Sequence, residues 1–375
     1  MNSDALLRPE IAHFEPYLPG RSLESVRREL GLKKIIKLAS NENPLGPSAK
    51  ALKAIQKAGK TLFRYPDGAS TVLRLALAEQ ADVSAESVIV GAGSDEIIEL
   101  LGKTFLNPGD SIIVSEHAFV RYQMAAEMMG AEAIAVPMKK LTHDLSAMVQ
   151  AIRPDTKMIF IANPNNPTGT YNTQAELVEL LQLVSKQNKL RPVPVIVIVD
   201  EAYYEYAKVL ASDYPDTLTL QKEFWNLMVI RTFSKAYGLA GLRVGYGFAE
   251  ASLIRAMDRV RPPFNVSLAG QEGALAALAD QAHVRKSVQM VIQERKKMLT
   301  ALEVLGVPVV PSVGNFFLMG VAPHRGQFIF EQFLKKGIIV RAMQEYGFPQ
   351  HIRVTIGLPQ ENQLFLNALK EILQK

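Results

Sequence analysis

Three polar side chains in this 375-residue chain each stand within five residues of the end of an apolar run of the kind that forms a buried strand. Asn166 lies in a turn with two prolines and a glycine, Asp200 follows the run 195–199, and Lys235 follows a serine. In open α/β sheets, ligands bind where the carboxyl ends of the strands meet. Asn166 and Asp200 are 34 residues apart, and Asp200 and Lys235 are 35 apart. We therefore expect the three side chains to share one crevice.

A lysine and a carboxylate in such a crevice indicate carbonyl chemistry beside a cationic ring. Burial removes water from the Lys235 ammonium, which lowers its pKa and makes the amine a nucleophile towards carbonyl carbons. Burying the Asp200 carboxylate is costly unless it meets a cation or hydrogen-bond donors, and a pyridinium N–H is such a partner. A metal ion is the competing partner, although no second carboxylate or histidine stands at ligand spacing near Asp200.

Two further stretches offer donors for a phosphate group. Residues 91–96 (Gly-Ala-Gly-Ser-Asp-Glu) follow an apolar run and open a helical pattern, where free amide groups and the Ser94 hydroxyl would make an anion cradle. The stretch begins like the dinucleotide fingerprint, but Glu96 replaces the third glycine, and an ordinary strand-to-helix turn is the alternative interpretation. Ser234 and Arg243 add a hydroxyl and a guanidinium that suit phosphate oxygens.

Short apolar runs alternate with longer amphipathic stretches in the central part of the chain. Buried strands are predicted at 87–90, 111–114, 158–161, 195–199 and 227–230, and helices at 95–105 and 174–187. Such alternation predicts an α/β fold with a mostly parallel sheet flanked by helices. The candidate catalytic residues would then lie in loops at the carboxyl edge of that sheet.

The pattern changes in the C-terminal third. Residues 261–265 (Arg-Pro-Pro-Phe-Asn) break the alternation, and a long helical stretch over 267–305 and strand-like runs at 315–319 and 352–356 follow. Chains longer than about 250–300 residues usually divide their apolar core between domains. We expect a large domain over 45–262 and a smaller α/β domain that combines 1–44 with 263–375.

Composition excludes several other classes of protein. The chain has no cysteine, so thiolate catalysis is ruled out, and its six histidines form no zinc motif. The 42 basic and 37 acidic residues give a net charge of +5 without a basic stripe, which predicts small anionic substrates rather than nucleic acid. The apolar runs are too short for a membrane span and the first residues lack a signal-peptide pattern, so we expect a cytoplasmic protein.

Together these motifs resemble the fold-type-I pyridoxal-phosphate (PLP) enzymes, and among them the aminotransferase class that includes the histidinol-phosphate aminotransferases. The matching stretches are Asn-Pro-Thr-Gly at 166–169, Asp-Glu-Ala-Tyr at 200–203, Ser-Lys at 234–235 and Gly-Leu-Arg-Val-Gly at 241–245. The resemblance runs from Asn41 to Thr355. It implies a large PLP-binding domain around a mostly parallel sheet and a smaller domain from the chain ends.

The resemblance also implies a role for each motif residue. Lys235 would hold PLP as a Schiff base and move the substrate proton, and Asp200 would pair with the ring nitrogen. Asn166 and Tyr203 would bind the phenolic oxygen of the ring, and Phe119 would stack on the ring. The residues that match the family's phosphate site are Gly93, Ser94, Asp95, Thr232, Ser234 and Arg243.

Further matches concern a neighbouring subunit and the substrates. Tyr65 matches a tyrosine that reaches the cofactor phosphate of the other subunit, which implies a homodimer; a surface aromatic in a turn is the alternative interpretation. Arg353 matches the arginine that grips the α-carboxylate of the amino donor, a task that suits its planar fork. Tyr17 and Arg341 match positions around the substrate phosphate, and Asn41 also lies in a stretch that matches the substrate site.

These matches predict amino transfer from L-glutamate to imidazole-acetol phosphate, which gives L-histidinol phosphate and 2-oxoglutarate in histidine biosynthesis. An aromatic-amino-acid aminotransferase and a PLP-dependent phosphothreonine decarboxylase of the same fold are the alternatives within this chemistry. A nicotinamide-dependent dehydrogenase would explain the α/β pattern but leaves Glu96, Asp200 and the Ser-Lys pair without a role.

Overall fold

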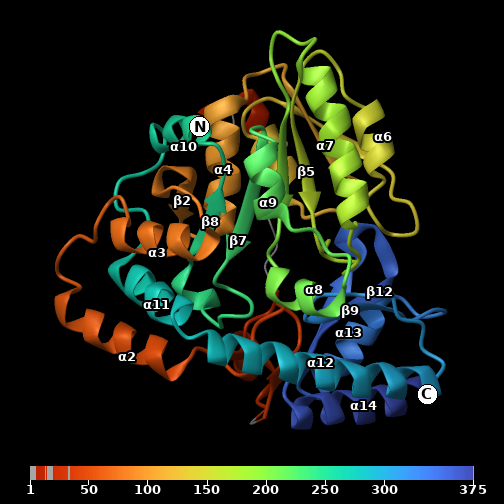
Figure 1. Cartoon of the computed structure of the whole chain (residues 1–375). Helices are drawn as coiled ribbons and strands as arrows, with labels where there is room; N and C mark the ends of the chain where they lie inside the picture. Colours follow the sequence, from red (N-terminus) through yellow and green to blue (C-terminus); the bar gives the residue numbers. More distant parts are fainter. Residues whose placement is uncertain (1–5, 13, 15–19, 33, 375) are drawn as a thin grey trace.

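A seven-stranded sheet drawn from the middle of the chain forms the centre of the molecule (Figure 1). The computed structural model describes residues 6–12, 14, 20–32 and 34–374. Across the sheet the strands are β2 (Val88–Gly91), β8 (Gly245–Phe248), β7 (Leu227–Thr232), β6 (Ile196–Asp200), β5 (Thr156–Ala162), β3 (Ser111–Ser115) and β4 (Glu132–Val136). All neighbours pair in parallel except β8, which is antiparallel to both β2 and β7. The predicted α/β class with a mostly parallel sheet is confirmed.

Both faces of this sheet are covered by helices, which explains why its strands are continuously apolar. In β7, Leu227 and Val229 belong to one apolar core, whereas Met228 and Ile230 belong to the other, because successive side chains of a strand point to opposite faces. The first core includes α3 (Thr71–Ala81), α6 (Leu145–Gln150), α7 (Gln174–Asn188), α8 (Tyr204–Leu210) and α9 (Thr217–Glu223). The second core includes α4 (Ser94–Phe105), α5 (Arg121–Glu127) and α10 (Ala251–Asp258).

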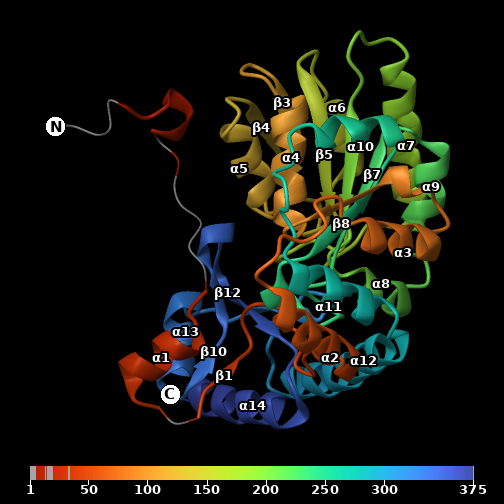
Figure 2. The same cartoon turned by 90° about the vertical axis from the view of Figure 1, so that its left-hand side faces the viewer.

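Two small sheets lie beside the large one (Figure 2). The three-stranded sheet is antiparallel, in the order β11 (Arg341–Met343), β12 (Phe348–Thr355) and β9 (Phe316–Gly320), and β1 (Ile36–Lys37) pairs in parallel with β10 (Ile338–Ile339). The other elements here are α1 (Leu23–Leu30), α13 (Gly326–Lys335) and α14 (Pro359–Leu373). Short 3₁₀ turns occur at Pro9–Ile11, Gly59–Thr61, Ala85–Ser87, Ala240–Leu242 and Gln344–Tyr346.

The helical stretch expected over 267–305 is two helices, α11 (Leu268–Leu278) and α12 (Gln281–Val304). Asp280 separates them with φ −109° and ψ 58°, in keeping with the preference of aspartate for helix ends over helix interiors. α11 packs mainly on α2 (Ala49–Ala58) and also on α3, whereas α12 packs on α14 and α8. α11 follows the predicted boundary near residue 262, yet it packs on two helices that were assigned to the large domain. The boundary therefore stays a prediction.

α12 is the longest of the described helices, yet neither it nor any other of them has the length and apolar composition needed to cross a membrane.

Candidate active site

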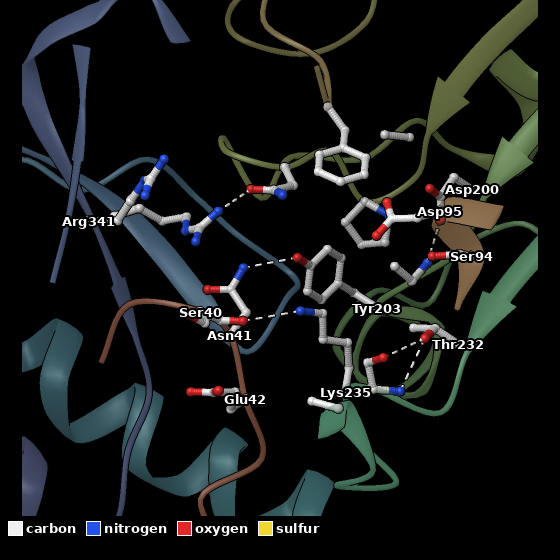
Figure 3. A pocket seen from close by; sticks show the side chains of 18 of the residues that line it. Ser40, Asn41, Glu42, Ser94, Asp95, Asp200, Tyr203, Thr232, Lys235 and Arg341 are labelled. Carbon is white, nitrogen blue, oxygen red and sulfur yellow. Dashed lines mark hydrogen bonds between the residues drawn. The ribbon is translucent and has the colours of Figure 1, made fainter. Parts of the chain in front are cut away.

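The predicted site residues gather around a cavity of about 280 Å³ at the carboxyl edge of the large sheet. Asp200 is the last residue of β6 and Thr232 the last of β7, while residues of the small sheets close the cavity from the other side (Figure 3). The predicted residues that line the cavity are Asn41, Ser94, Asp95, Phe119, Asn166, Asp200, Tyr203, Thr232, Ser234, Lys235, Arg243, Arg341 and Arg353. The structure thus brings together motifs that are as much as 312 residues apart in the sequence.

Lys235 is held in a tight turn after β7. Within this turn the Gly238 amide donates to the Lys235 carbonyl at 2.9 Å, and Gly238 has φ +73°. A Cβ atom at Gly238 would lie 2.3 Å from the carbonyl oxygen of Gly46, so only glycine allows this close approach. The Lys235 ammonium donates to the carbonyl oxygen of Ser40 at 3.1 Å (Figure 3).

The pKa of Lys235 is lowered to about 8, first by burial and then by the nearby positive charge of Arg353. A lysine with this pKa is partly unprotonated near neutral pH. Its nitrogen can therefore act as a nucleophile and as a base.

Asp200 is 5% exposed, and its carboxylate accepts hydrogen bonds from the Tyr122 hydroxyl (2.8 Å) and the Ala202 amide (3.1 Å). Burial is the main cause that raises its pKa to about 6, although both hydrogen bonds act in the opposite direction. In the described part of the chain, no lysine, arginine or histidine forms an ion pair with it. The site therefore presents a buried carboxylate that a cationic N–H group on a ligand would satisfy.

A cradle for an anion lies where β2 leads into α4. Gly93 precedes the helix with φ +87°, and no side chain caps this helix end, so the first amide groups of α4 have no acceptor within the helix. A Cβ atom at Gly93 would lie 2.6 Å from Nη2 of Arg243, so glycine is needed for the guanidinium to reach the cradle. Arg243 donates to the Asp95 carboxylate at 3.2 Å.

Two hydroxyl groups on the loop after β7 complete this corner of the cavity. Thr232 donates to the Ser234 hydroxyl at 3.0 Å and accepts from the Ser234 amide at 3.1 Å. Both residues are buried, and both line the cavity with Ser94 and Arg243. Hydroxyls, helix amides and a guanidinium are the donors that phosphate oxygens prefer.

Tyr203 is positioned by a residue from the N-terminal part of the chain. Nδ2 of Asn41 donates to the Tyr203 hydroxyl at 2.9 Å. Asn41 is itself held by Thr355, which accepts from its amide at 2.9 Å and donates to its Oδ1 atom at 3.0 Å. Asn41 has φ +54°, a left-handed conformation that asparagine tolerates better than most residues. The Tyr203 hydroxyl is thus fixed between the large sheet and the small one.

Two arginines come from neighbouring strands of the small sheet, where Arg341 of β11 is the partner of Arg353 in β12. Arg353 is 7% exposed and donates to Oδ1 of Asn166 and to the carbonyl oxygen of Ala39 (2.6 Å). Arg341 donates to the Glu345 carboxylate at 2.7 Å. Both guanidinium groups line the cavity, so it can receive a ligand with two anionic groups.

The remaining predicted residues lie elsewhere or outside the described chain. Tyr65 does not line the cavity: it is 82% exposed and stacks on Phe264 with ring centroids 4.6 Å apart. Tyr17 lies outside the described residues. Gly93 does not line the cavity itself, but it lies against the guanidinium of Arg243, which does. Where the dinucleotide fingerprint has its third glycine, Glu96 accepts a hydrogen bond from the Ala92 amide at 2.6 Å.

Sequence reasoning missed Tyr122 and Ser40, which contact Asp200 and Lys235 respectively. For Tyr122 a weak signal existed, since it stands three residues after the predicted Phe119 and therefore shares a face with it where the chain is helical. For Ser40 there was none, because its contribution is a backbone carbonyl.

Comparison with known proteins agrees with this geometry. The family model of class I and II aminotransferases matches residues 33–369. A histidinol-phosphate aminotransferase of Moorella thermoacetica is 46% identical over 367 residues, which cover 98% of this chain and 92% of that protein. One from Anaeromyxobacter sp. is 45% identical over 369 residues, 98% of this chain and 99% of that one.

A solved structure is also similar over the whole chain. The histidinol-phosphate aminotransferase of Sinorhizobium meliloti, in complex with pyridoxal-5'-phosphate, matches with a TM-score of 0.86 and 26% identity, covering 98% of this chain and 97% of that one. The chain therefore belongs to the class I and II aminotransferase family and, within that family, to the histidinol-phosphate aminotransferases.

Proposed function

We propose that this enzyme uses pyridoxal 5'-phosphate to exchange an amino group between L-glutamate and imidazole-acetol phosphate, forming L-histidinol phosphate and 2-oxoglutarate. The observation that carries the proposal is the convergence of Lys235, Asp200 and two arginines on one cavity. Relatives at 45–46% identity over nearly their whole length are histidinol-phosphate aminotransferases, which supports the choice of substrate.

The residues of the cavity fit the cofactor at three separate points. Asp200 is a buried carboxylate that needs a cationic N–H partner, which a protonated pyridine ring has. Gly93 and Arg243 form part of an anion cradle in which a Cβ atom would collide with the guanidinium. Lys235 has a pKa of about 8 and so can attack an aldehyde near neutral pH. One group that carries a phosphate, a basic ring nitrogen and an aldehyde meets all three needs.

When bound, PLP draws electrons away from the substrate Cα–H bond and so makes that proton acidic. Lys235 is the base in the cavity that can take this proton on Nζ and return it, because its pKa is lowered to about 8. Asp200, whose ionised form the bond from Tyr122 favours, would supply a negative charge to a protonated ring nitrogen. Tyr203, oriented by Asn41, and Asn166, held by Arg353, supply polar groups at fixed positions on the cavity wall.

Both substrates carry anionic groups that the two arginines can receive. Arg353 offers a planar, largely buried guanidinium to the α-carboxylate of glutamate. Arg341 lies on the adjacent strand, 14% exposed, and would take the phosphate of the imidazole substrate. Because one cavity serves both half-reactions, glutamate and the oxo-phosphate must bind in turn, and ping-pong kinetics are expected.

We further propose that the enzyme is a cytoplasmic homodimer in which Tyr65 reaches the cofactor phosphate of the neighbouring subunit. Tyr65 does not line the cavity of its own chain and is largely exposed. Leu62 is 59% exposed and Phe63 is 78% exposed beside it, and Phe264 under its ring is 44% exposed. Apolar side chains gathered on a surface in this way favour burial against a partner.

The test of function is a comparison of amino donors in the reverse direction. The purified, PLP-loaded enzyme is given 2-oxoglutarate with L-histidinol phosphate, L-phenylalanine or L-threonine phosphate, and glutamate and carbon dioxide are measured. We expect glutamate from histidinol phosphate with a kcat/KM at least about tenfold above that for phenylalanine, since a charged contact is worth 1.4 kcal/mol or more. A higher value for phenylalanine, or carbon dioxide from threonine phosphate, would contradict the proposed substrate.

A further inference from the structure

A second cavity, of about 200 Å³, shares none of its lining residues with the active site. It lies between α3, α8 and α9 on one side and β7 and β8 on the other, and the first residue of α12 also borders it. Tyrosine rings, glutamine amides and charged side chains make up most of its wall, so a polar occupant is indicated.

Glu205 on α8 is the buried carboxylate of this cavity. It is 5% exposed, its carboxylate accepts a hydrogen bond from its own backbone amide, and within the described residues no lysine, arginine or histidine forms a close ion pair with it. A buried carboxylate without a close cation is expensive to keep ionised, and burial raises the pKa of Glu205 to about 7. A cationic group inside the cavity would remove that cost.

Arg231 borders the same cavity, but its charge is already compensated. Its Nε and Nη2 atoms both lie 2.8 Å from Oε2 of Glu201, and its guanidinium carbon lies 3.5 Å from the centroid of the Tyr204 ring. Glu201 is completed by a hydrogen bond from Thr217 at 2.7 Å. Arg231 therefore directs its hydrogen bonds at Glu201, and it acts on Glu205 only by longer-range attraction, which lowers the pKa of Glu205.

Lys208 is the second charged group of the cavity without an ionic partner among the described residues. It stands one turn after Glu205 on α8, and its ammonium lies 4.6 Å from the centroid of the Tyr204 ring. Glu205 and Lys208 form no close ion pair with each other in the described part of the chain, although each shifts the pKa of the other by longer-range attraction. The lining of the cavity therefore includes one acidic and one basic side chain that do not contact each other.

We propose that this cavity binds a free α-amino acid, with its ammonium group on Glu205 and its carboxylate on Lys208. A zwitterion satisfies both charges at once, whereas an inorganic ion or a simple amine would satisfy one of them. The hydroxyl and amide groups of Tyr237 and Gln281 line the same space, and about 200 Å³ accommodates a ligand of amino-acid size. The proposal concerns a site separate from catalysis and does not depend on the identity of the reaction.

The cavity is joined to the active site through the loop that carries Lys235. Tyr237 follows Lys235 by two residues, and its ring packs on Phe233 with centroids 4.8 Å apart. A ligand in the cavity would therefore touch the same loop that positions the catalytic lysine.

The test uses 2-aminoisobutyrate, an α-amino acid without an α-hydrogen, which transamination cannot consume. Equilibrium dialysis of the PLP-loaded enzyme against the radiolabelled compound counts all bound molecules, and the visible absorption of the cofactor follows those in the active site. We expect one molecule per chain beyond the active site. Glu205→Gln and Lys208→Gln should each weaken this second site by about tenfold or more while the absorption titration stays unchanged. Glu223→Gln, at an exposed carboxylate at the end of α9, is the matched control and should bind like the wild type.

Two single-charge analogues sharpen the result. Isopropylamine and isobutyrate each keep one charge of the zwitterion, and each should bind the second site about tenfold more weakly. Binding of a single molecule per chain by the wild type, unchanged binding by Lys208→Gln, or equal binding of isopropylamine would each overturn the proposal. Lys208 is exposed, so its variant decides the question even where Glu205→Gln does not fold.

Discussion

The hydroxyl group of Tyr122 donates a hydrogen bond of 2.8 Å to Oδ2 of Asp200. Tyr122 is buried, with its ring stacked on Phe160 at 4.8 Å and in edge contact with Phe119 at 5.8 Å. The bond favours the ionised form of Asp200, whereas burial favours the neutral form. Tyr122 therefore orients the carboxylate of Asp200, which lines the cavity, and partly offsets the effect of burial on its pKa.

Replacing Tyr122 with phenylalanine keeps the ring packing and removes only this donor. We expect PLP to bind about ten- to a hundredfold more weakly, because a hydrogen bond to a charged group contributes roughly 1.5–3 kcal/mol. Equilibrium dialysis of the apoenzyme against PLP measures the change. Tyr206→Phe is the matched control, since the Tyr206 hydroxyl is buried without a hydrogen-bond partner among the described residues. A Tyr122→Phe protein that binds PLP with wild-type affinity would contradict a role for Tyr122 in cofactor binding.

Asp200 should make the apoenzyme less stable as the pH rises. Its pKa goes from 3.8 to about 6 on folding, so between these values the folded protein binds more protons than the unfolded chain and stability falls with pH. This rise in pKa corresponds to roughly 3 kcal/mol in the free energy of unfolding, and the loss is complete only above pH 6.

Asp200→Asn carries no charge there, so its apoenzyme should be more stable than the wild type at neutral pH, with little difference near pH 4, while activity is lost. Urea unfolding of both apoproteins at the two pH values gives the comparison. A wild type that is the more stable of the two at neutral pH would contradict the idea that Asp200 lacks a cation in the empty fold.

Lys235 should control how fast the apoenzyme takes up PLP. Only the unprotonated amine attacks an aldehyde, and the pKa of Lys235 is about 8. Below this pH the uptake rate should fall by about tenfold per pH unit, and above it the rate should level off. Stopped-flow absorbance records the rate, and Lys235→Ala provides the baseline, because it can bind PLP without this reaction and should show no such step. A wild-type profile without a rise towards pH 8 would speak against the lowered pKa.

Arg341 should distinguish phosphorylated from unphosphorylated substrates. It donates to Glu345 at 2.7 Å and faces the cavity, so Arg341→Gln removes a charge without removing the polar contact to that carboxylate. KM for L-histidinol phosphate should rise about tenfold or more, while KM for L-glutamate changes little. Arg353→Gln should instead raise KM for glutamate, because glutamate is the substrate whose α-carboxylate Arg353 is proposed to bind. An equal rise in KM for both substrates in Arg341→Gln would show that Arg341 does not bind the substrate phosphate.

Tyr65 and Lys235 should complement each other across the proposed dimer. Tyr65→Ala and Lys235→Ala proteins are each expected to be impaired, yet a mixed dimer has one site with Lys235 from one subunit and Tyr65 from its partner. After subunit exchange, activity should recover to about a quarter of the wild type, because half of random pairs are mixed and each has one complete site. If Tyr65 served its own subunit, mixing would restore nothing.

Local pattern alone was enough to predict the central strands and the groups that stand at their ends. Runs such as Val197–Val199 are continuously apolar because helices cover both faces of a parallel sheet, and this leaves a strong signal in the sequence. The carboxyl ends of parallel strands meet at one edge, so Asn166, Asp200 and Lys235 were expected to converge, and they line one cavity. The break at Asp280 was missed, since one residue leaving helical geometry hardly disturbs an apolar pattern.

Only the tertiary structure decided which partners these groups receive. Tyr122 is 78 residues from Asp200, Asn41 is 162 from Tyr203, and the Ser40 carbonyl is 195 from the Lys235 amine it accepts from. Such pairs form because separate elements pack side by side. The sequence around either residue gives no indication of which residue its partner is. The same packing sets the pKa values of Lys235 and Asp200, because burial and neighbouring charge exist only once the chain is folded.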